Sequence, residues 1–470
     1  MKKMLWNMAR VCALPPLRRG GQGGETSARR SRTRQLAAAL ALCLSGCAMP
    51  LAAQPAGPLR LEDALSIGLE SSYGIRIARQ TEALAEVSNT PGAAGMLPTA
   101  AFAATQSLAT NNTQLKFFSG DERSVNGATT VNFNANVQLN WTLFDGMAMF
   151  VRRDRLAESA ALQSVQTQRE VAAAAYGITL AFYNVVIQQE LYRVLEQNLT
   201  LSADRRQLAA GRLRVGAGSE LALLQARVDF NTDSSALLRQ ELALTQSKAR
   251  LNRLLLYDPG APLEVQPGVP LDQTLSLDTL EAEIMSQNPE LLAARANIRL
   301  SELAVREARA DLLPSLNLNA TLNFTRFTTE AGVLQSNRSY GPSAALVLSY
   351  PIFSAGARRR AIEGAAIGAE QASLRYESLR ADLQSDLYLQ YEAYRAALEL
   401  IAIEAASLEI ARSNAAITAG KYRLGAANEL EVRQAQVNLV AAENRLLSAR
   451  YTAKLAETDL RFLAGQLRVD

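Results

Sequence analysis

The side chains that most often carry out chemistry are scarce in this sequence of 470 residues. Histidine is absent, which excludes His-based acid–base catalysis and imidazole ligands for metals. The three cysteines all lie in the first 47 residues, so the rest of the chain has neither a disulfide framework nor a cysteine nucleophile. The sequence also has no phosphate-binding loop and no paired carboxylates in a cleft-like context. We therefore expect neither an enzyme nor a cofactor or metal site.

One of the cysteines could still be modified. The segment Leu44-Ser-Gly-Cys47 resembles a lipobox, in which Cys47 would be lipidated and become the mature N-terminus. The alternative is ordinary cleavage near Ala52 and Ala53, with Cys47 as one more small residue before the cleavage site. Both interpretations take the protein out of the cytoplasm.

The first 53 residues form the expected targeting segment, with an unusually long basic region. Nine Lys and Arg residues between Lys2 and Arg34 precede an apolar run from Leu36 to Leu44, which is far shorter than the ~20 residues of a spanning helix. Residues 1–53 contribute +8, so their removal changes the net charge from +4 to −4. The basic charge of the whole chain therefore gives no support to nucleic-acid binding.

Two glycine-rich breaks carry the remaining candidates for polar contacts with a partner. Gly211–Ser219 contains Gly216 and Gly420–Asn428 contains Gly425, and glycine suits the left-handed backbone of tight turns. Plain turns between helices, with solvated surface charges beside them, are a compatible interpretation. The charged residues that flank the breaks are Arg214, Glu220 and Arg423.

Long helices must position these breaks. The stretches Met147–Ala210 and Ala357–Thr418 contain no proline and almost no glycine, and each could form a helix of ~90–95 Å at 1.5 Å per residue. After each break an apolar residue recurs at every seventh position, which predicts coiled-coil packing against a partner helix. Leu221, Val228 and Leu242 add a neighbouring stripe, as in a helix with neighbours on both sides; an ordinary amphipathic bundle helix is the alternative. The repeat comprises Leu223, Phe230, Leu237, Leu244 and Leu251 in one half, and Val432, Leu439, Leu446, Ala453 and Leu460 in the other.

Alternating residues predict four β-strands. Apolar residues occupy every second position of the thirteen from Val131 to Leu143, with Asn, Gln and Thr between them, and this length fits a tilted membrane crossing of ~9–11 residues. Leu316–Phe324 and Ala344–Ile352 alternate in the same way, and Thr99–Thr110 is an Ala-rich fourth segment. The uncharged polar face is expected to line a water-filled lumen. A soluble sandwich is the alternative, but two hairpins offer little sheet for the apolar rows to pack against.

The chain contains one unit twice. Residues 61–98 match 277–314 at an offset of 216, and later motifs match at 209, as in Gly211-Arg-Leu-Arg-Val-Gly216 and Gly420-Lys-Tyr-Arg-Leu-Gly425. Two structural copies must then pack as neighbours. We divide the chain into a signal peptide (1–53), a first repeat (54–256), a linker (257–276) and a second repeat (277–470). The expected hairpins lie at about 99–144 and 315–353, and the helix tips at about 211–219 and 420–428.

Four strands cannot close a membrane barrel, and an open sheet edge cannot lie in lipid because its backbone groups stay unpaired. Closure needs at least about eight strands, and three chains would supply twelve, so a homotrimer is the simplest cyclic solution. We therefore predict a mainly α protein with membrane β-structure. Its twelve-stranded outer-membrane β-barrel, four strands per chain, would continue into a long periplasmic α-helical coiled-coil barrel.

The sequence resembles the TolC-type outer-membrane factor family over residues 59–465, in order and in both copies. The paired Gly-x4-Gly breaks belong to this pattern. The other motifs that carry the resemblance are Leu61-Glu-Asp-Ala-Leu65, Leu312-Leu-Pro-Ser-Leu316, and Leu143-Phe-Asp-Gly146 with its partner Pro351-Ile-Phe353.

This resemblance implies an outer-membrane exit duct of a tripartite export machine, embedded in outer-membrane lipid. Its partners would be a periplasmic adaptor (a membrane fusion protein) and an inner-membrane transporter, with an ABC exporter favoured and a proton-driven pump as the alternative. The short distance from the signal to Leu61 favours type I secretion of a protein, such as a toxin, over efflux of drugs or other small molecules. A periplasmic adaptor and a structural coiled-coil protein are weaker rivals, because neither needs the membrane-type strands.

The resemblance also implies where the channel closes. Aligned on Tyr422 and Gly425, Glu431 falls where the family's namesake has an acidic residue at the constriction, and Gln434 falls where it has a second one. Three copies of Glu431 around a trimer axis would form an electronegative ring, with Tyr422 as a further constriction residue. The Arg–Asp lock of the namesake is missing, since Ala427 and Ala222 occupy those positions. Arg214, Arg423 and Glu220 could substitute, and the tips with Gly216 and Gly425 would dock the adaptor.

Overall fold

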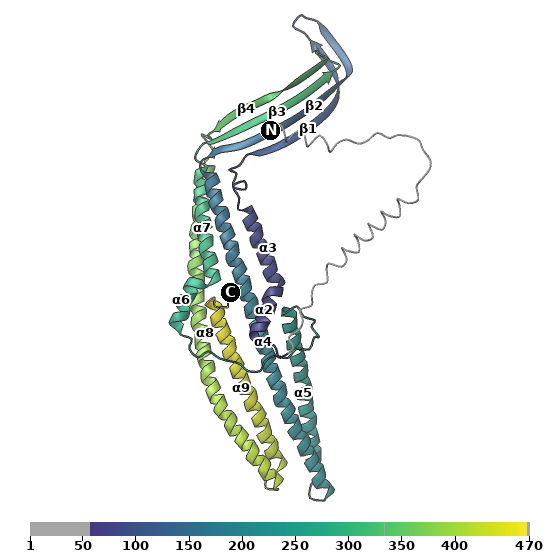
Figure 1. Cartoon of the computed structure of the whole chain (residues 1–470), viewed down its shortest axis with the longest axis vertical. Helices are drawn as coiled ribbons and strands as arrows, with labels where there is room; N and C mark the ends of the chain where they lie inside the picture. The colour runs from purple at the N-terminus through teal and green to yellow at the C-terminus, as the bar shows by residue number, and fades with distance from the viewer. Residues whose placement is uncertain (1–56, 333, 468–470) are drawn as a thin grey trace, which may run out of the picture. The chain divides into compact units, whose positions relative to one another are not determined.

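The computed structural model describes residues 57–332 and 334–467, so the predicted signal peptide and Cys47 lie outside the described part. Long helices and one sheet make up that part (Figure 1). In chain order its elements are α2 (Leu61–Ser71), α3 (Tyr73–Ser88), β1 (Thr99–Lys116), β2 (Glu122–Asp145), α4 (Ala148–Arg214), α5 (Glu220–Leu254), α6 (Leu277–Gln287), α7 (Pro289–Ala310), β3 (Ser315–Thr329), β4 (Ser336–Ser349), α8 (Ala357–Arg423) and α9 (Glu429–Leu463).

The helices form a wall that is four helices wide. α4 and α8 each have 67 residues, which corresponds to about 100 Å at 1.5 Å per residue. In the half that ends in the helix tips, α5 packs on α4, α4 on α9 and α9 on α8. In the half next to the sheet, the order is α3, α4, α7 and α8 (Figure 1). The wall therefore has two outer edges, one formed by α3 and α5 and the other by α8.

Each repeat builds its own apolar core at the middle of the wall. In the first repeat Ile178 and Phe182 of α4 pack with Leu251 of α5, and in the second Leu387 of α8 packs with Leu460 of α9. One stretch of α4 is apolar enough to cross a bilayer by composition, but half of it is buried inside the protein. That stretch is therefore the core segment of a long helix, in keeping with its contacts to α2 and α9.

The four strands form one antiparallel sheet in the order β1-β2-β3-β4. The register pairs Val137 with Phe102 on β1 and with Leu322 on β3, so the apolar residues of neighbouring strands share one face. Four strands per chain, as the alternation predicted, are confirmed. The expected strand Ala344–Ile352 began and ended too late, because β4 runs from Ser336 to Ser349. Pro351 has no backbone N–H to continue a strand ladder.

The strands join the helices at a close-packed junction. Gly146 follows β2 with φ of 70°, and a Cβ atom there would lie 2.2 Å from the carbonyl oxygen of Ala310, so only glycine fits. Asp145 forms an ion pair with Arg152 on the first turns of α4, and the indole N–H of Trp141 donates to the carbonyl oxygen of Met96 at 3.1 Å. These contacts set the direction in which the sheet leaves the helices.

Candidate functional site at the helix tips

The two pairs of long helices end in turns of the same construction. Val215–Ser219 joins α4 to α5 and Leu424–Asn428 joins α8 to α9. Gly216 and Gly425 have φ of 76° and 79°, the left-handed backbone that the sequence predicted for them. Each helix continues four to five residues beyond its expected end at Ala210 or Thr418, which makes the turns shorter than the predicted breaks.

Backbone hydrogen bonds close both turns. The N–H of Ala217 donates to the carbonyl oxygen of Arg212 and that of Ala426 to the carbonyl oxygen of Lys421, each at 2.8 Å. Both are the long bond of a Schellman motif, which satisfies carbonyl groups that a helix end leaves free. Beside these turns, exposed charged side chains are available to a partner: Arg214, Glu220 and Arg423.

Glu431 is exposed and takes part in a capping box at the start of α9. The Oδ1 of Asn428 accepts from the backbone N–H of Glu431 at 2.9 Å, and the Oε2 of Glu431 accepts from the backbone N–H of Asn428 at 3.3 Å. Its carboxylate therefore has a local structural role besides any role in a channel. Gln434, one turn further, is also exposed and donates to Asn438 at 2.9 Å.

Tyr422 lies inside the protomer, with 4% of its surface exposed. Its hydroxyl group contacts the carboxylate of Glu429. The Arg212 guanidinium lies 4.6 Å from the ring centroid and donates to the carbonyl oxygen of Tyr422 at 2.7 Å. Burial, together with the hydrogen-bonded and negatively charged Glu429, raises the pKa of Tyr422 to about 12. Tyr422 thus joins the two hairpins, and its role at a constriction stays a prediction.

A buried charged cluster joins the hairpins above the tips, and the sequence did not reveal it. Arg433 of α9 binds both carboxylate oxygens of Asp233 on α5, at 2.7 and 3.0 Å. Arg205 of α4 donates to Asp229 of α5 at 2.8 Å and to Gln436 of α9 at 2.6 Å. We call Arg205, Asp229, Asp233 and Arg433 the inter-hairpin clamp.

Electrostatics favour the charged forms within this clamp. The hydrogen-bonded carboxylate of Asp233, with the charge of Asp229, raises the pKa of the Arg433 guanidinium above its usual value. The hydroxyl of Ser202 also contacts Asp233. Bidentate pairing of a guanidinium with a carboxylate fixes both side chains in one geometry. The clamp therefore holds the α4–α5 hairpin against α9 in one defined register.

Comparison of the two copies could have found the clamp. Asp229 and Asp233 of the first copy correspond to Asn438 and Ala442 of the second at the offset of 209, while Arg433 of the second corresponds to Leu224 of the first. At these positions the first copy thus has two acidic residues that the second lacks, and the second has a basic residue that the first lacks. This complementarity marks the surface on which the copies pack, although it does not say which residues meet.

The exposed charged side chains at the tips are suited to recognition of a partner. Among the residues that the structure describes, no group of His, Cys, Asp and Glu could hold a metal ion. A membrane-type sheet that continues into a wall of long helices, with polar contacts at the far tips, defines the protomer of an outer-membrane channel with a periplasmic extension.

Comparisons with known proteins support this class. Residues 281–466 match the sequence model of the outer membrane efflux protein family. Protein CyaE of Bordetella pertussis is 26% identical over 341 residues, 70% of this chain and 69% of that protein. The alkaline protease secretion protein AprF of Pseudomonas aeruginosa is 22% identical, over 90% of this chain and 88% of that protein. The cation efflux system protein CusC of Escherichia coli is 24% identical, over 72% of this chain and 74% of that protein.

Solved structures show the same fold. The structure of CusC superposes on this chain with a TM-score of 0.69 at 18% identity. The match covers 86% of this chain and 91% of the CusC chain. VceC of Vibrio cholerae superposes with a TM-score of 0.69 at 15% identity, and the match covers 86% of this chain and 96% of the VceC chain. Together with the family match over residues 281–466, these likenesses support placing the chain among TolC-like outer-membrane factors. It is a channel protein of the Gram-negative outer membrane with a β-barrel segment and a periplasmic helical extension.

Proposed function

We propose that this chain is one third of a homotrimeric duct that passes an unfolded protein from an inner-membrane ABC exporter and a periplasmic adaptor to the outside. As an exit duct it would have no enzymatic activity. The observation that carries the proposal is a four-stranded sheet with two unpaired edges, continuous with a helical wall that also has two unpaired apolar edges.

The sheet supports closure by other copies of itself. β1 and β4 are its edge strands, and in lipid their free backbone groups must find partners. β1 and β4 run in opposite directions, so β4 of one copy can pair antiparallel with β1 of the next. Two copies would give eight strands, whose interior is just filled by side chains, whereas twelve leave room for water. The polar face of Asn, Gln and Thr favours the larger ring.

The helical wall supports the same ring. Its two outer edges carry large exposed apolar side chains at heptad spacing: Leu221, Val228 and Leu242 on α5, and Ile403, Ile410 and Ile417 on α8. Next to the sheet, Ile77 and Leu84 of α3 and Ile367 and Leu374 of α8 repeat the pattern. Each edge of one copy thus matches the opposite edge of another, and packing them would remove the stripes from water.

The tips would close the duct. We propose that three copies of Glu431 form the electronegative constriction, with Gln434 one turn away and Tyr422 bracing the hairpins beside it. The inter-hairpin clamp would hold the closed arrangement, since opening requires the α4–α5 hairpin to separate from α9. The adaptor would dock on the exposed tips near Arg214, Glu220 and Arg423, which Gly216 and Gly425 present.

The similar proteins favour two classes of cargo. AprF, by its name a secretion protein, aligns with nearly the whole chain, and this favours protein secretion. CusC, by its name part of a cation efflux system, aligns with a shorter part, and this favours efflux of a small solute as the second candidate. A proton-driven pump would replace the ABC exporter in that case.

Deleting the gene in its host distinguishes protein secretion from efflux of a small solute. Loss of one or a few secreted proteins from the medium, restored by the wild-type gene and without a change in sensitivity to drugs or metal ions, is the expected result. Increased sensitivity with an unchanged set of secreted proteins would assign the chain to efflux instead. If neither property changed under conditions in which the protein is made, the export function itself would be wrong.

A further inference from the structure

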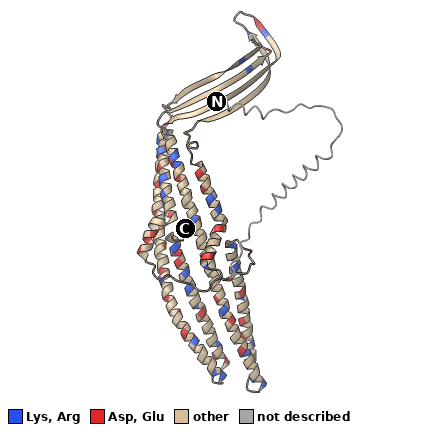
Figure 2. Cartoon of the chain, viewed as in Figure 1, with Lys and Arg blue, Asp and Glu red and all other residues tan. Residues whose placement is uncertain are grey.

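Charge is almost absent from the four strands, and two of the few charges are placed unusually (Figure 2). Lys116, Glu122 and Arg123 lie at the outer hairpin of β1 and β2, and Asp145 lies at the junction with the helices. The other two charged strand residues, Arg326 of β3 and Arg338 of β4, lie within the sheet.

The register places these two arginines directly opposite each other. Arg326 pairs with Arg338 across β3 and β4, and Phe133 of β2 pairs with Arg326. Directly opposed residues of antiparallel strands share a face, and Phe133 belongs to the apolar row. Both guanidinium groups therefore lie on the face that carries the apolar rows, which is the lipid-facing side of the proposed barrel. The remaining residue of their paired row is Gln106 of β1, which is polar but uncharged.

Neither arginine has an acidic partner among the described residues. Like charges directly opposite each other destabilise a sheet. Arg338 lies 5.2 Å from the ring centroid of Phe324, which supports its position but does not neutralise it. Glu330, in the turn between β3 and β4, instead accepts from the backbone N–H of Thr129 at 2.9 Å. In a closed ring the neighbouring β1 would bring no carboxylate, since Lys116 is its one charged residue.

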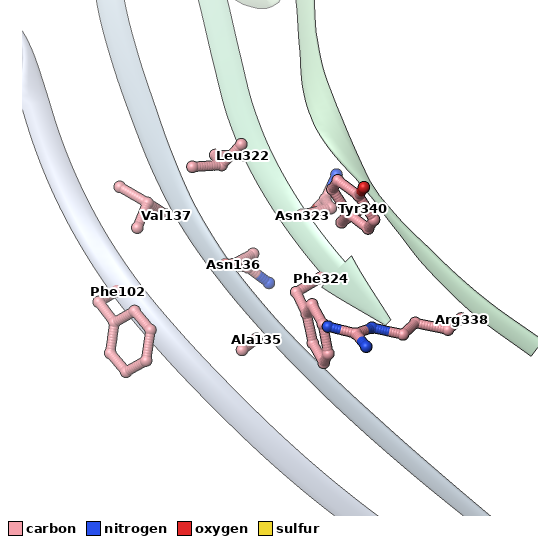
Figure 3. A pocket seen from close by; sticks show the side chains of 9 residues that line it. All are labelled: Phe102, Ala135, Asn136, Val137, Leu322, Asn323, Phe324, Arg338 and Tyr340. Atoms are coloured by element: carbon pink, nitrogen blue, oxygen red, sulfur yellow. The ribbon is translucent and has the colours of Figure 1, made fainter. Parts of the chain in front are cut away.

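A hollow opens on the same face beside Arg338 (Figure 3). Its volume is about 570 Å³, and its apolar lining comes from Phe102, Ala135, Val137, Leu322, Phe324 and Tyr340. Figure 3 shows the Arg338 side chain reaching to the Phe324 ring at its margin. A second hollow of about 470 Å³ shares Val137 and Leu322 and extends along the sheet past Leu139 and Ala344. Together they form an apolar groove with a cation at one end.

The arginine pair lies at the level where lipid headgroups are expected. The helices join one end of the sheet, so the β3–β4 turn at the other end faces outside. Outward-facing apolar residues run from Leu316 to Phe324 on β3, which is ~26 Å at 3.3 Å per residue before tilt, close to the height of an apolar barrel band. Arg326 is the next outward residue beyond this band.

We propose that Arg326 and Arg338 bind the phosphate group of an anionic lipid in the outer leaflet, with one of its acyl chains lying in the groove. Guanidinium groups bind phosphate through paired charge-assisted hydrogen bonds. A phosphate between the two arginines would also cancel the repulsion that the register creates. The assignment depends on the outer-membrane location and on the outward direction of the apolar face, and not on the exported cargo.

Native mass spectrometry tests this proposal by measuring how tightly bisphosphorylated lipid A binds to the full-length protein, which is purified in detergent as the folded oligomer. The test variant is R326Q/R338Q, and R123Q is the matched control because Arg123 is an arginine of the outer hairpin outside this pair. We expect the double variant to bind lipid A at least about tenfold more weakly, as loss of charge-assisted hydrogen bonds predicts. R123Q should bind like the wild type, and phosphatidylethanolamine should not discriminate between the three proteins.

Circular dichroism and oligomer stability establish that each variant is folded. Equal binding of lipid A by wild type and double variant would overturn the proposal, as would an equal loss in R123Q, which would indicate a general effect of surface charge. Inorganic phosphate at the same molar excess should not displace the lipid. If it did, the pair would be a site for free anions and the assignment to lipid would be wrong.

Discussion

At the scale of single residues, Glu431 has one structural role and one proposed role, and a substitution that removes its carboxylate would affect both. Its side chain completes the capping box of α9, and in the proposed trimer it would also supply the charge of the constriction. Removal of the whole carboxylate weakens the helix start and the charged ring together. Glutamine separates the two roles, because it can retain the capping bond while it removes the charge.

We predict that E431Q and E431A both reduce cation selectivity of the channel in planar bilayers, because each removes the proposed ring of negative charge. Only E431A should also lower thermal stability, by about 1 kcal/mol for a lost cap. Reversal potentials in a salt gradient and melting curves measure the two effects. An unchanged reversal potential and unchanged cation block in E431Q would remove Glu431 from the constriction.

Tyr422 shows what a resemblance cannot decide. Alignment placed it at the constriction, yet the structure buries its ring beside Arg212 and brings its hydroxyl to Glu429. Because its pKa is raised to about 12, the hydroxyl stays protonated and remains a hydrogen-bond donor throughout the neutral range. The residue type suits a narrow channel and a buried brace equally, and only the packing of the second hairpin against the first distinguishes them.

At the scale of helices, the inter-hairpin clamp is the contact that we expect opening of the proposed duct to break. Arg433 is mostly buried between two acids of α5, at 2.7 Å from Asp233 and 3.6 Å from Asp229. Removing one partner of a buried ion pair leaves the other charge uncompensated and costs about 3 kcal/mol or more. The repulsion between the two carboxylates would add to this and push α5 away from α9.

R433A is therefore expected to raise the single-channel conductance of the resting channel by loosening the tips. The matched control is R412A, since Arg412 forms exposed ion pairs with Glu409 and Glu443 inside one hairpin. That substitution should leave the conductance unchanged. Equal conductance of R433A and wild type would show that the clamp does not restrain the tips.

The helices and strands themselves were largely predictable, because their periods are local properties of the sequence. The alternation around Val131–Leu143 indicated a strand whose outward residues the register aligns with those of β3. The heptads after the breaks predicted packed helices, and Leu251 and Leu460 are fully buried. The clamp was not predictable in the same way. Asp233 and Arg433 are 200 positions apart, and their contact depends on how two similar copies dock.

At the scale of the whole molecule, the described chain leaves matching surfaces at its two sides. The sheet ends in β1 and β4, and the helical wall ends in α5 and α8. Proteins usually cover such edges. Sheet edges are covered by backbone pairing with another strand, and apolar helix edges are covered by packing against another helix. A closed ring of three copies covers all of them with one type of contact, which is the central claim of the proposed function.

Cross-linking of α5 to α8 tests this claim most directly. Val228 lies nine residues from Ser219, and Ile417 lies seven from Leu424, so both are about equally far from their tips. Since α4 and α9 stand between these helices within one chain, a V228C/I417C variant treated with a short bismaleimide should cross-link between chains. We predict covalent dimers and trimers, with nothing larger, and unlinked chains for each single-cysteine variant. Products that stay monomeric, or a ladder that continues beyond three chains, would contradict the trimeric duct.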